Sequence, residues 1–205
     1  MSHKLTVLPH LIKHTPKGLI PKHGSIKVFA FDLDHTIIQP CNGLRFSRTA
    51  YDWQFMEYGD ATTLENLIQI VKNDPTAHVV IFSNQGGVIA LPPDSKSCTK
   101  YVAKIDLILK AISLTYQGEE LLQKLWIYAS PKAPARTKNC AMFEQMRKPC
   151  IGMMEQFQQD IAAPIDLQYY CGDAAGRPTD FSDSDLLFAQ NLHTQFRLPE
   201  DVFIT

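Results

Sequence analysis

Four short apolar segments, each followed directly by polar or small residues, constrain the fold of this chain more than any other feature. They lack the alternation of apolar and polar residues that marks a strand with one solvent face, so we predict strands buried on both sides. Strands of this kind belong to parallel sheets covered by helices. The segments are 27–31 (KVFAF), 78–82 (HVVIF), 125–129 (LWIYA) and 167–171 (LQYYC), and we expect a further strand at the C-terminal DVFIT (201–205).

Helical patterns fill the intervals between these strands. The first of them opens with Thr62 and Glu65, the spacing of a capping box, and continues with regularly spaced leucine and isoleucine. The alternation of strands and helices predicts an α/β fold built on a doubly wound parallel sheet. The helical patterns cover residues 62–73, 99–114, 152–161 and 184–193.

Composition indicates an ordinary globular domain. Apolar residues make up 45% of the 205 positions and charged residues 20%, which is enough to build a sizeable core. The five cysteines form no C-x-x-C pair, so we expect free thiols in a reducing compartment rather than disulfides or a zinc site. No apolar run approaches the roughly 18 residues of a membrane span, so no membrane partner is expected.

The N-terminal residues differ in charge from the remainder of the chain. Residues 1–30 contain five lysines and four histidines but no acidic residue. We expect a solvated basic extension at residues 1–25, followed by one domain at 26–205. A nucleic-acid-binding arm and a targeting signal are alternatives that the sequence leaves open.

The polar residues after the strands are predicted to form one site, because the carboxyl ends of parallel strands meet at a shared crevice. Asp32 and Asp34 follow the first strand, and Asp173 follows the fourth. Their charges would repel one another unless they share a cation, and hard carboxylate oxygens suit Mg²⁺. Ser83 adds a hydroxyl and Lys148 a positive charge, so the set predicts phosphoryl transfer.

Several sequence motifs resemble those of a known family. FDLDHT, VVIFSNQ, RKP and CGDAAGRPTDFSDSDLLFAQNL are similar to the four motifs of the haloacid dehalogenase superfamily of phosphatases. GDAAGRP, DFS and PEDVFI resemble more closely the polynucleotide kinase 3′-phosphatase family, and the resemblance covers residues 27–205. It implies a haloacid dehalogenase-like, Rossmann-type fold without a large cap domain. It also implies a free-standing, Mg²⁺-dependent DNA 3′-phosphatase that acts in nuclear DNA repair.

The same resemblance implies a role for each site residue. Asp32 would attack phosphorus to form an aspartyl-phosphate, and Asp34 would act as general acid and then as general base. Mg²⁺ would be held by the Asp32 carboxylate, the Asp34 backbone carbonyl and Asp173. Ser83 and Lys148 would contact the phosphoryl oxygens. Asp185 and Thr36 are expected to lie next to these residues and hold them in position without contacting the substrate.

Two features depart from the family pattern. His35 follows Asp34 where many members have glycine, and it could contact the leaving strand or point away. The segment 130–139 also lengthens the approach to Lys148, which leaves the preceding helix undetermined.

A DNA end is the substrate that best fits an open, lidless site. Asn42-Gly43 predicts a type I′ hairpin, and its flank carries arginines and aromatic rings suited to stacking on unpaired bases. Trp53 could instead pack on the domain, and Arg177 could instead pair with an acidic residue such as Asp180 or Asp183. The candidate DNA contacts are Arg45, Arg48, Asn84 and Arg177, with a second basic stretch at Lys132, Arg136, Lys138, Arg147 and Lys148.

The expected partner is therefore DNA with a 3′-phosphate on a single-stranded or frayed terminus. The sequence contains no G-x-x-x-x-G-K-[S/T] motif, so neither ATP binding nor kinase activity is expected. We expect a monomer. Two alternatives stay open: a capless phosphatase of the same superfamily that acts on a small metabolite, and a non-catalytic module that binds DNA ends.

Overall fold

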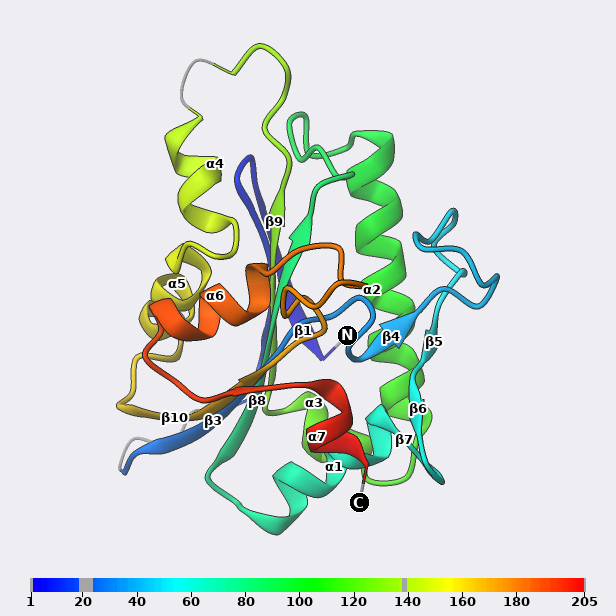
Figure 1. Ribbon diagram of the computed structural model, residues 1–205, viewed down its shortest axis with the longest axis vertical. Coiled ribbons are helices and arrows are strands. Elements are labelled where there is room, and N and C mark those ends of the chain that lie inside the picture. The colour runs from blue at the N-terminus through cyan, green and yellow to red at the C-terminus, as the bar shows by residue number, and fades with distance from the viewer. Residues whose placement is uncertain (1, 19–23, 138–139, 205) are drawn as a thin grey trace.

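Seven strands form one central sheet in the computed structural model, which describes residues 2–18, 24–137 and 140–204 (Figure 1). The last five strands in the spatial order are mutually parallel, and the first two form an antiparallel hairpin at one edge. The order is β1 (His3–Leu8), β2 (Leu11–Pro16), β9 (Leu125–Pro131), β8 (Ala77–Gln85), β3 (Ile26–Phe31), β10 (Ile165–Cys171) and β11 (Phe196–Arg197).

Helices cover both faces of this sheet, because successive residues of each buried strand point to opposite sides. Val79 and Ile81 of β8 belong to the core on one face, whereas Val80 and Phe82 belong to the core on the other. The predicted doubly wound α/β sheet is therefore confirmed. The first face carries α1 (Thr63–Asn73), α2 (Lys96–Leu114), α3 (Gly118–Leu122) and α7 (Pro199–Phe203), and the second carries α5 (Gly152–Ile161) and α6 (Ser184–Asn191), with α4 (Ala141–Met146) ahead of α5.

The elements predicted from apolar pattern and capping are found close to their expected bounds. Thr62 and Glu65 form the expected capping box at α1, with the Thr62 amide donating to the Glu65 carboxylate over 2.7 Å. Between β3 and β8 lie only α1 and two small sheets, so the described chain has no cap domain at this point. The small sheets pair β4 (Ile38–Gln39) with β5 (Gln54–Phe55), and β6 (Glu57–Tyr58) with β7 (Ala61–Thr62).

The N-terminal residues are not the solvated extension predicted for 1–25. Strand β2 pairs antiparallel with β9, and Leu11 and Ile12 are fully buried. Lys13 forms an ion pair with Asp160 of α5, with Nζ 2.7 Å from the carboxylate. Residues 3–16 therefore belong to the central sheet, because β2 pairs with the edge of β9 and its apolar side chains join the cores on both faces. Met1 and residues 19–23 lie outside the described residues.

The C-terminal segment is a short helix, not the predicted strand. Pro199 occupies the first turn of α7, a position that proline favours because its missing N–H is not needed there. The Leu198 amide donates to the Asp201 carboxylate over 3.2 Å, which satisfies one group at the helix start. Phe203 is thereby buried against the sheet. Thr205 lies outside the described residues.

The predicted type I′ hairpin at Asn42-Gly43 is also wrong. A type I′ turn needs positive φ at both central residues, but only Gly43 has one, at 72°. β4 and β5 instead enclose the longer loop 40–53. The buried Asp52 carboxylate organises this loop by accepting hydrogen bonds from the Asn42 side chain and, over 2.9 Å, from the Arg48 amide.

All five cysteines are free, as expected. None of the helices in the described part of the chain is both long and apolar enough to cross a membrane.

Candidate active site

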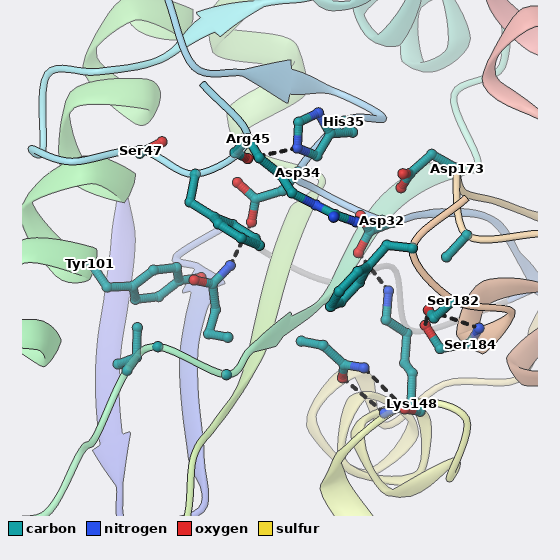
Figure 2. A pocket seen from close by; sticks show the side chains of 18 of the residues that line it. Asp32, Asp34, His35, Arg45, Ser47, Tyr101, Lys148, Asp173, Ser182 and Ser184 are labelled. Carbon is teal, nitrogen blue, oxygen red and sulfur yellow. Dashed lines mark hydrogen bonds and ion pairs between the residues drawn. The ribbon is translucent and has the colours of Figure 1, made fainter. Parts of the chain in front are cut away.

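A cavity of about 650 Å³ opens at the carboxyl ends of β3, β8 and β10 (Figure 2). Asp32 and Asp34 enter it from the end of β3, Gln85 from β8 and Asp173 from the loop after β10. Lys148 reaches it from the loop that follows α4. Residues up to about 140 positions apart in sequence therefore meet in one place because their strands run parallel.

Three carboxylates form the acidic centre of the cavity. One oxygen each from Asp32, Asp173 and Asp185 lies within 4.8 Å of the other two. Burial raises the pKa of Asp32 well above its usual range, and burial followed by the charge of Asp185 raises the pKa of Asp173 to about 6. Clustered carboxylates that are costly to ionise are stabilised by a bound divalent cation. The all-oxygen donor set fits Mg²⁺.

Lys148 holds two of these carboxylates from inside the protein. Its Nζ lies 2.5 Å from Asp32 Oδ1 (Figure 2). It also lies 2.7 Å from Asp185 Oδ1 and donates to the Tyr170 hydroxyl over 2.7 Å. Burial alone would lower the pKa of Lys148, but the charges of Asp185 and Asp32 outweigh it, so the pKa is raised. Lys148 is therefore a fixed cation that orients the Asp32 carboxylate.

Asn84 positions Lys148 through two hydrogen bonds with its backbone. The Lys148 amide donates to Asn84 Oδ1 over 2.9 Å, and Asn84 Nδ2 donates to the Lys148 carbonyl over 3.0 Å (Figure 2). Asn84 was a candidate DNA contact by sequence, but its side chain is engaged in fixing the lysine. The pairing spans 64 residues and has no local sequence signal.

Asp185 supports the acidic centre from α6, in the position expected for it. Its Oδ1 accepts from Lys148 and from the Tyr170 hydroxyl, and its Oδ2 accepts from the Ala174 amide over 3.0 Å. The close approach requires glycine at position 172, because a Cβ there would lie 2.4 Å from Asp185 Oδ2. Thr36, the other expected support, is fully buried, lies outside the cavity lining and makes no side-chain hydrogen bond to any described residue.

The Asp34 side chain is held on the other side of the cavity. Its Oδ2 accepts from Gln85 Nε2 over 2.7 Å (Figure 2). Its Oδ1 lies 3.2 Å from Lys104 Nζ. Gln85 Nε2 also donates to Ser83 Oγ over 2.8 Å. Ser83 is buried beneath Gln85 and does not line the cavity, so direct contact between its hydroxyl and a phosphoryl group stays a prediction.

Sequence inspection missed Lys104, Gln85 and Tyr170. Lys104 is only 7% exposed, in the middle of the apolar face of α2. A lysine interrupting an apolar helical face was an available signal, since a buried ammonium needs an anionic partner. Gln85 and Tyr170 lie at or near strand exits, and nothing in the local pattern separates them from ordinary sheet residues.

An Arg–aromatic rim borders the cavity. The Arg45 guanidinium lies 4.0 Å from the centre of the Phe181 ring and 5.6 Å from that of Phe46. Phe46 is 66% exposed and Phe181 70% exposed, so both rings can meet a ligand. His35 has a φ of 62° and its Nε2 lies 2.8 Å from the Arg45 carbonyl oxygen, which ties the loop 40–53 to the strand exit. The left-handed backbone at His35 is the conformation that glycine adopts most easily.

Several other candidate DNA contacts lie away from the active-site cavity. Arg177 pairs with Asp180 at 2.9 Å and with Glu200 at 2.7 Å outside the cavity lining, so the pairing alternative is the one observed. Trp53 packs edge-to-face on Phe55, with ring centres 5.4 Å apart.

Arg48 lines a second, smaller cavity. Of the second basic stretch, Lys132, Arg136 and Arg147 are exposed, Lys148 is buried, and Lys138 lies outside the described residues.

Comparisons with known proteins identify the family of this chain. A family model described as polynucleotide kinase 3 phosphatase matches residues 27–203. A polynucleotide 3′-phosphatase of Saccharomyces cerevisiae is 49% identical over an alignment of 236 positions, which covers 99% of each chain. One of Saccharomyces mikatae is 46% identical and covers 99% of this chain and 96% of its own. The bifunctional polynucleotide phosphatase/kinase of Schizosaccharomyces pombe is 32% identical over 90% of this chain and 40% of its own.

Solved structures show the same fold at low sequence identity. A putative HAD-like phosphatase from Mesorhizobium loti superposes with a TM-score of 0.54 and 16% identity, over 89% of this chain and 76% of its own. A D,D-heptose 1.7-bisphosphate phosphatase from B. bronchiseptica gives a TM-score of 0.55 and 18% identity, over 84% and 79%. These two matches show a haloacid dehalogenase-like fold. The chain therefore belongs to the polynucleotide kinase 3 phosphatase family, as its motifs predicted.

Proposed function

We propose that this protein is a Mg²⁺-dependent polynucleotide 3′-phosphatase that restores 3′-hydroxyl ends on broken DNA. The observation that carries the proposal is the buried centre in which Lys148 orients Asp32 beside Asp173 and Asp185. This centre lies in an open cavity, in a chain with two relatives named polynucleotide 3′-phosphatase. A role in nuclear DNA repair is part of the same proposal.

The Asp32 carboxylate is the proposed nucleophile. It attacks phosphorus, so that a bond forms between the carboxylate oxygen and phosphorus while the bond from phosphorus to the sugar O3′ breaks. Lys148 keeps this carboxylate in place. Mg²⁺, held by Asp32, Asp173 and the backbone carbonyl of Asp34, would neutralise charge on the phosphoryl oxygens.

Asp34 is the proposed proton carrier. Its carboxyl group would protonate the departing O3′ and then accept a proton from the water that hydrolyses the aspartyl-phosphate. Gln85 and Lys104 hold its two oxygens apart from the acidic centre, so that the side chain faces the cavity and not the metal position. This separation assigns the two neighbouring aspartates different tasks.

The rim favours a polynucleotide over a small metabolite. An exposed arginine between two exposed aromatic rings can stack on an unpaired base at the strand terminus. The cavity, at about 650 Å³, has the size of a small-ligand pocket. In this proposal it holds only the end of the DNA strand, and the remainder of the strand lies outside it.

The proposal is tested with an oligonucleotide panel. We expect a 3′-phosphorylated oligonucleotide to be dephosphorylated much faster than a 5′-phosphorylated one or a 3′-mononucleotide, because contacts beyond the reacting phosphate orient it. Initial rates of phosphate release give kcat/KM for each substrate. Equal efficiency on the oligonucleotide and on small phosphomonoesters would favour a capless metabolite phosphatase. Tight binding of DNA ends without turnover would favour a non-catalytic module.

Metal binding has a readout that does not depend on turnover. We expect Mg²⁺ to raise the Tm, since a ligand bound only by the native state stabilises it by about 2.7 kcal/mol at a hundredfold excess over Kd. Asp173→Asn should shift this response to higher Mg²⁺ concentration, whereas Asp166→Asn, an exposed acid on β10, should not. A Tm that does not respond to Mg²⁺, together with full activity in EDTA, would remove the metal from the proposal.

A further inference from the structure

A second cavity of about 550 Å³ adjoins the first. It lies between the loop 40–53, the segment after β8 and the start of α2. Lys100 lines both cavities, so the two hollows share a wall. Lys100 Nζ also lies 3.5 Å from the Arg48 carbonyl oxygen, which brings the loop against the helix. The smaller cavity is therefore a continuation of the larger one along the surface.

Three of the eight residues that line the second cavity are cations. Arg48, Lys96 and Lys100 contribute to it, and all three are exposed. No carboxylate lines it, and none of these three cations forms an ion pair with any acid in the described ranges. Asp94 is the single acidic residue between positions 86 and 100, and it does not line the cavity. Three cations left without anionic partners around one hollow indicate a polyanionic ligand.

We propose that this second cavity binds the phosphodiester backbone of the DNA strand just upstream of the 3′-phosphate. The inference rests on the proposed function, because it names the path of that substrate away from the active site. The hydroxyls of Ser95 and Ser97 are hydrogen-bonded within the protein and fix the shape of the wall, and the half-exposed Leu91 offers an apolar contact for a sugar or base. The basic stretch after β9 is a poorer path, because Lys132 and Arg136 line neither cavity and only its end, at Arg147 and Lys148, reaches the first one.

The test compares two double variants and a matched single variant. Arg48→Ala with Lys96→Ala should lower kcat/KM on a 3′-phosphorylated oligonucleotide on the order of tenfold, with the slope of log(kcat/KM) against log[salt] reduced by about 0.7 per lost contact. In the same variant, the ratio of kcat/KM on the oligonucleotide to kcat/KM on the 3′-mononucleotide should also fall. Lys132→Ala with Arg136→Ala, and Lys110→Ala on the exposed side of α2, should leave both quantities unchanged.

A series of oligonucleotide lengths locates the contact. For the wild-type chain we expect kcat/KM to rise with each added nucleotide until the strand spans the second cavity, and for the Arg48/Lys96 variant we expect the rise to be lost. An unchanged length dependence and salt slope in that variant would overturn the inference while the wild-type activity on DNA stands. A loss confined to the Lys132/Arg136 variant would also overturn it and place the strand on the other side. A wild-type chain without activity on any 3′-phosphorylated oligonucleotide would instead reject the proposed function itself.

Discussion

Asp32→Asn is expected to lose more than ~10²-fold in turnover of a 3′-phosphorylated oligonucleotide, as covalent catalysts do when the nucleophile is removed. The amide has nearly the shape of the carboxylate, so the fold should persist, but it cannot attack phosphorus. Single-turnover rates with the purified variant measure the loss, and binding of the same oligonucleotide checks that the site still forms.

The matched control is Asp166→Asn, which changes an exposed acid on the neighbouring strand β10 by the same chemistry. We expect that variant to turn over at the wild-type rate. If the Asp32 variant kept more than about a hundredth of the wild-type rate, another group would have to be the nucleophile.

Lys148→Met is expected to be the most destabilising change in the site. It leaves the buried carboxylates of Asp32 and Asp185 without their shared cation, and removing one partner of a buried ion pair costs about 3–5 kcal/mol. Urea denaturation without Mg²⁺ measures the loss in the free energy of unfolding. Turnover should fall as well, since the nucleophile is no longer oriented.

Arg147→Ala is the control for that experiment, because the neighbouring arginine is exposed and should change the unfolding free energy little. Added Mg²⁺ should restore part of the stability lost in Lys148→Met, since the cation replaces some of the missing positive charge. If Lys148→Met and the wild-type chain were equally stable in the absence of Mg²⁺, the buried carboxylates would have to be protonated and would need no cation.

The candidate site could be predicted from sequence to the extent that it depends on strand exits. Asp32, Asp34 and Asp173 follow apolar segments, and parallel strands bring their carboxyl ends together whatever the sequence distance. The roles of Asn84 and Lys104 could not be predicted in the same way. Asn84 binds the Lys148 backbone and Lys104 pairs with Asp34, and both contacts exist only after the helices pack.

The edges of the sheet were the least predictable part of the fold. Residues 3–16 contain lysines and histidines but no acidic residue, so charge indicated a solvated tail and obscured the pairing of β2 with β9. At the other end, DVFIT has the composition of a strand, but Pro199 favours a helix start two residues earlier. In both places a tertiary contact decided between two conformations that the local sequence allows.

The most direct measurement follows the phosphorus atom itself. An oligonucleotide carrying a radiolabelled 3′-phosphate is mixed with the protein and Mg²⁺, quenched in acid within a single turnover, and the protein and strand are separated. We expect label to appear transiently on the protein as a hydroxylamine-labile acyl phosphate and then as free phosphate, while the strand gains a 3′-hydroxyl that a polymerase can extend. Label should never appear on Asp32→Asn. Release of phosphate with no labelled protein at any time, or equal labelling of the Asp32→Asn variant, would contradict the assignment of Asp32 as the group that removes the 3′-phosphate.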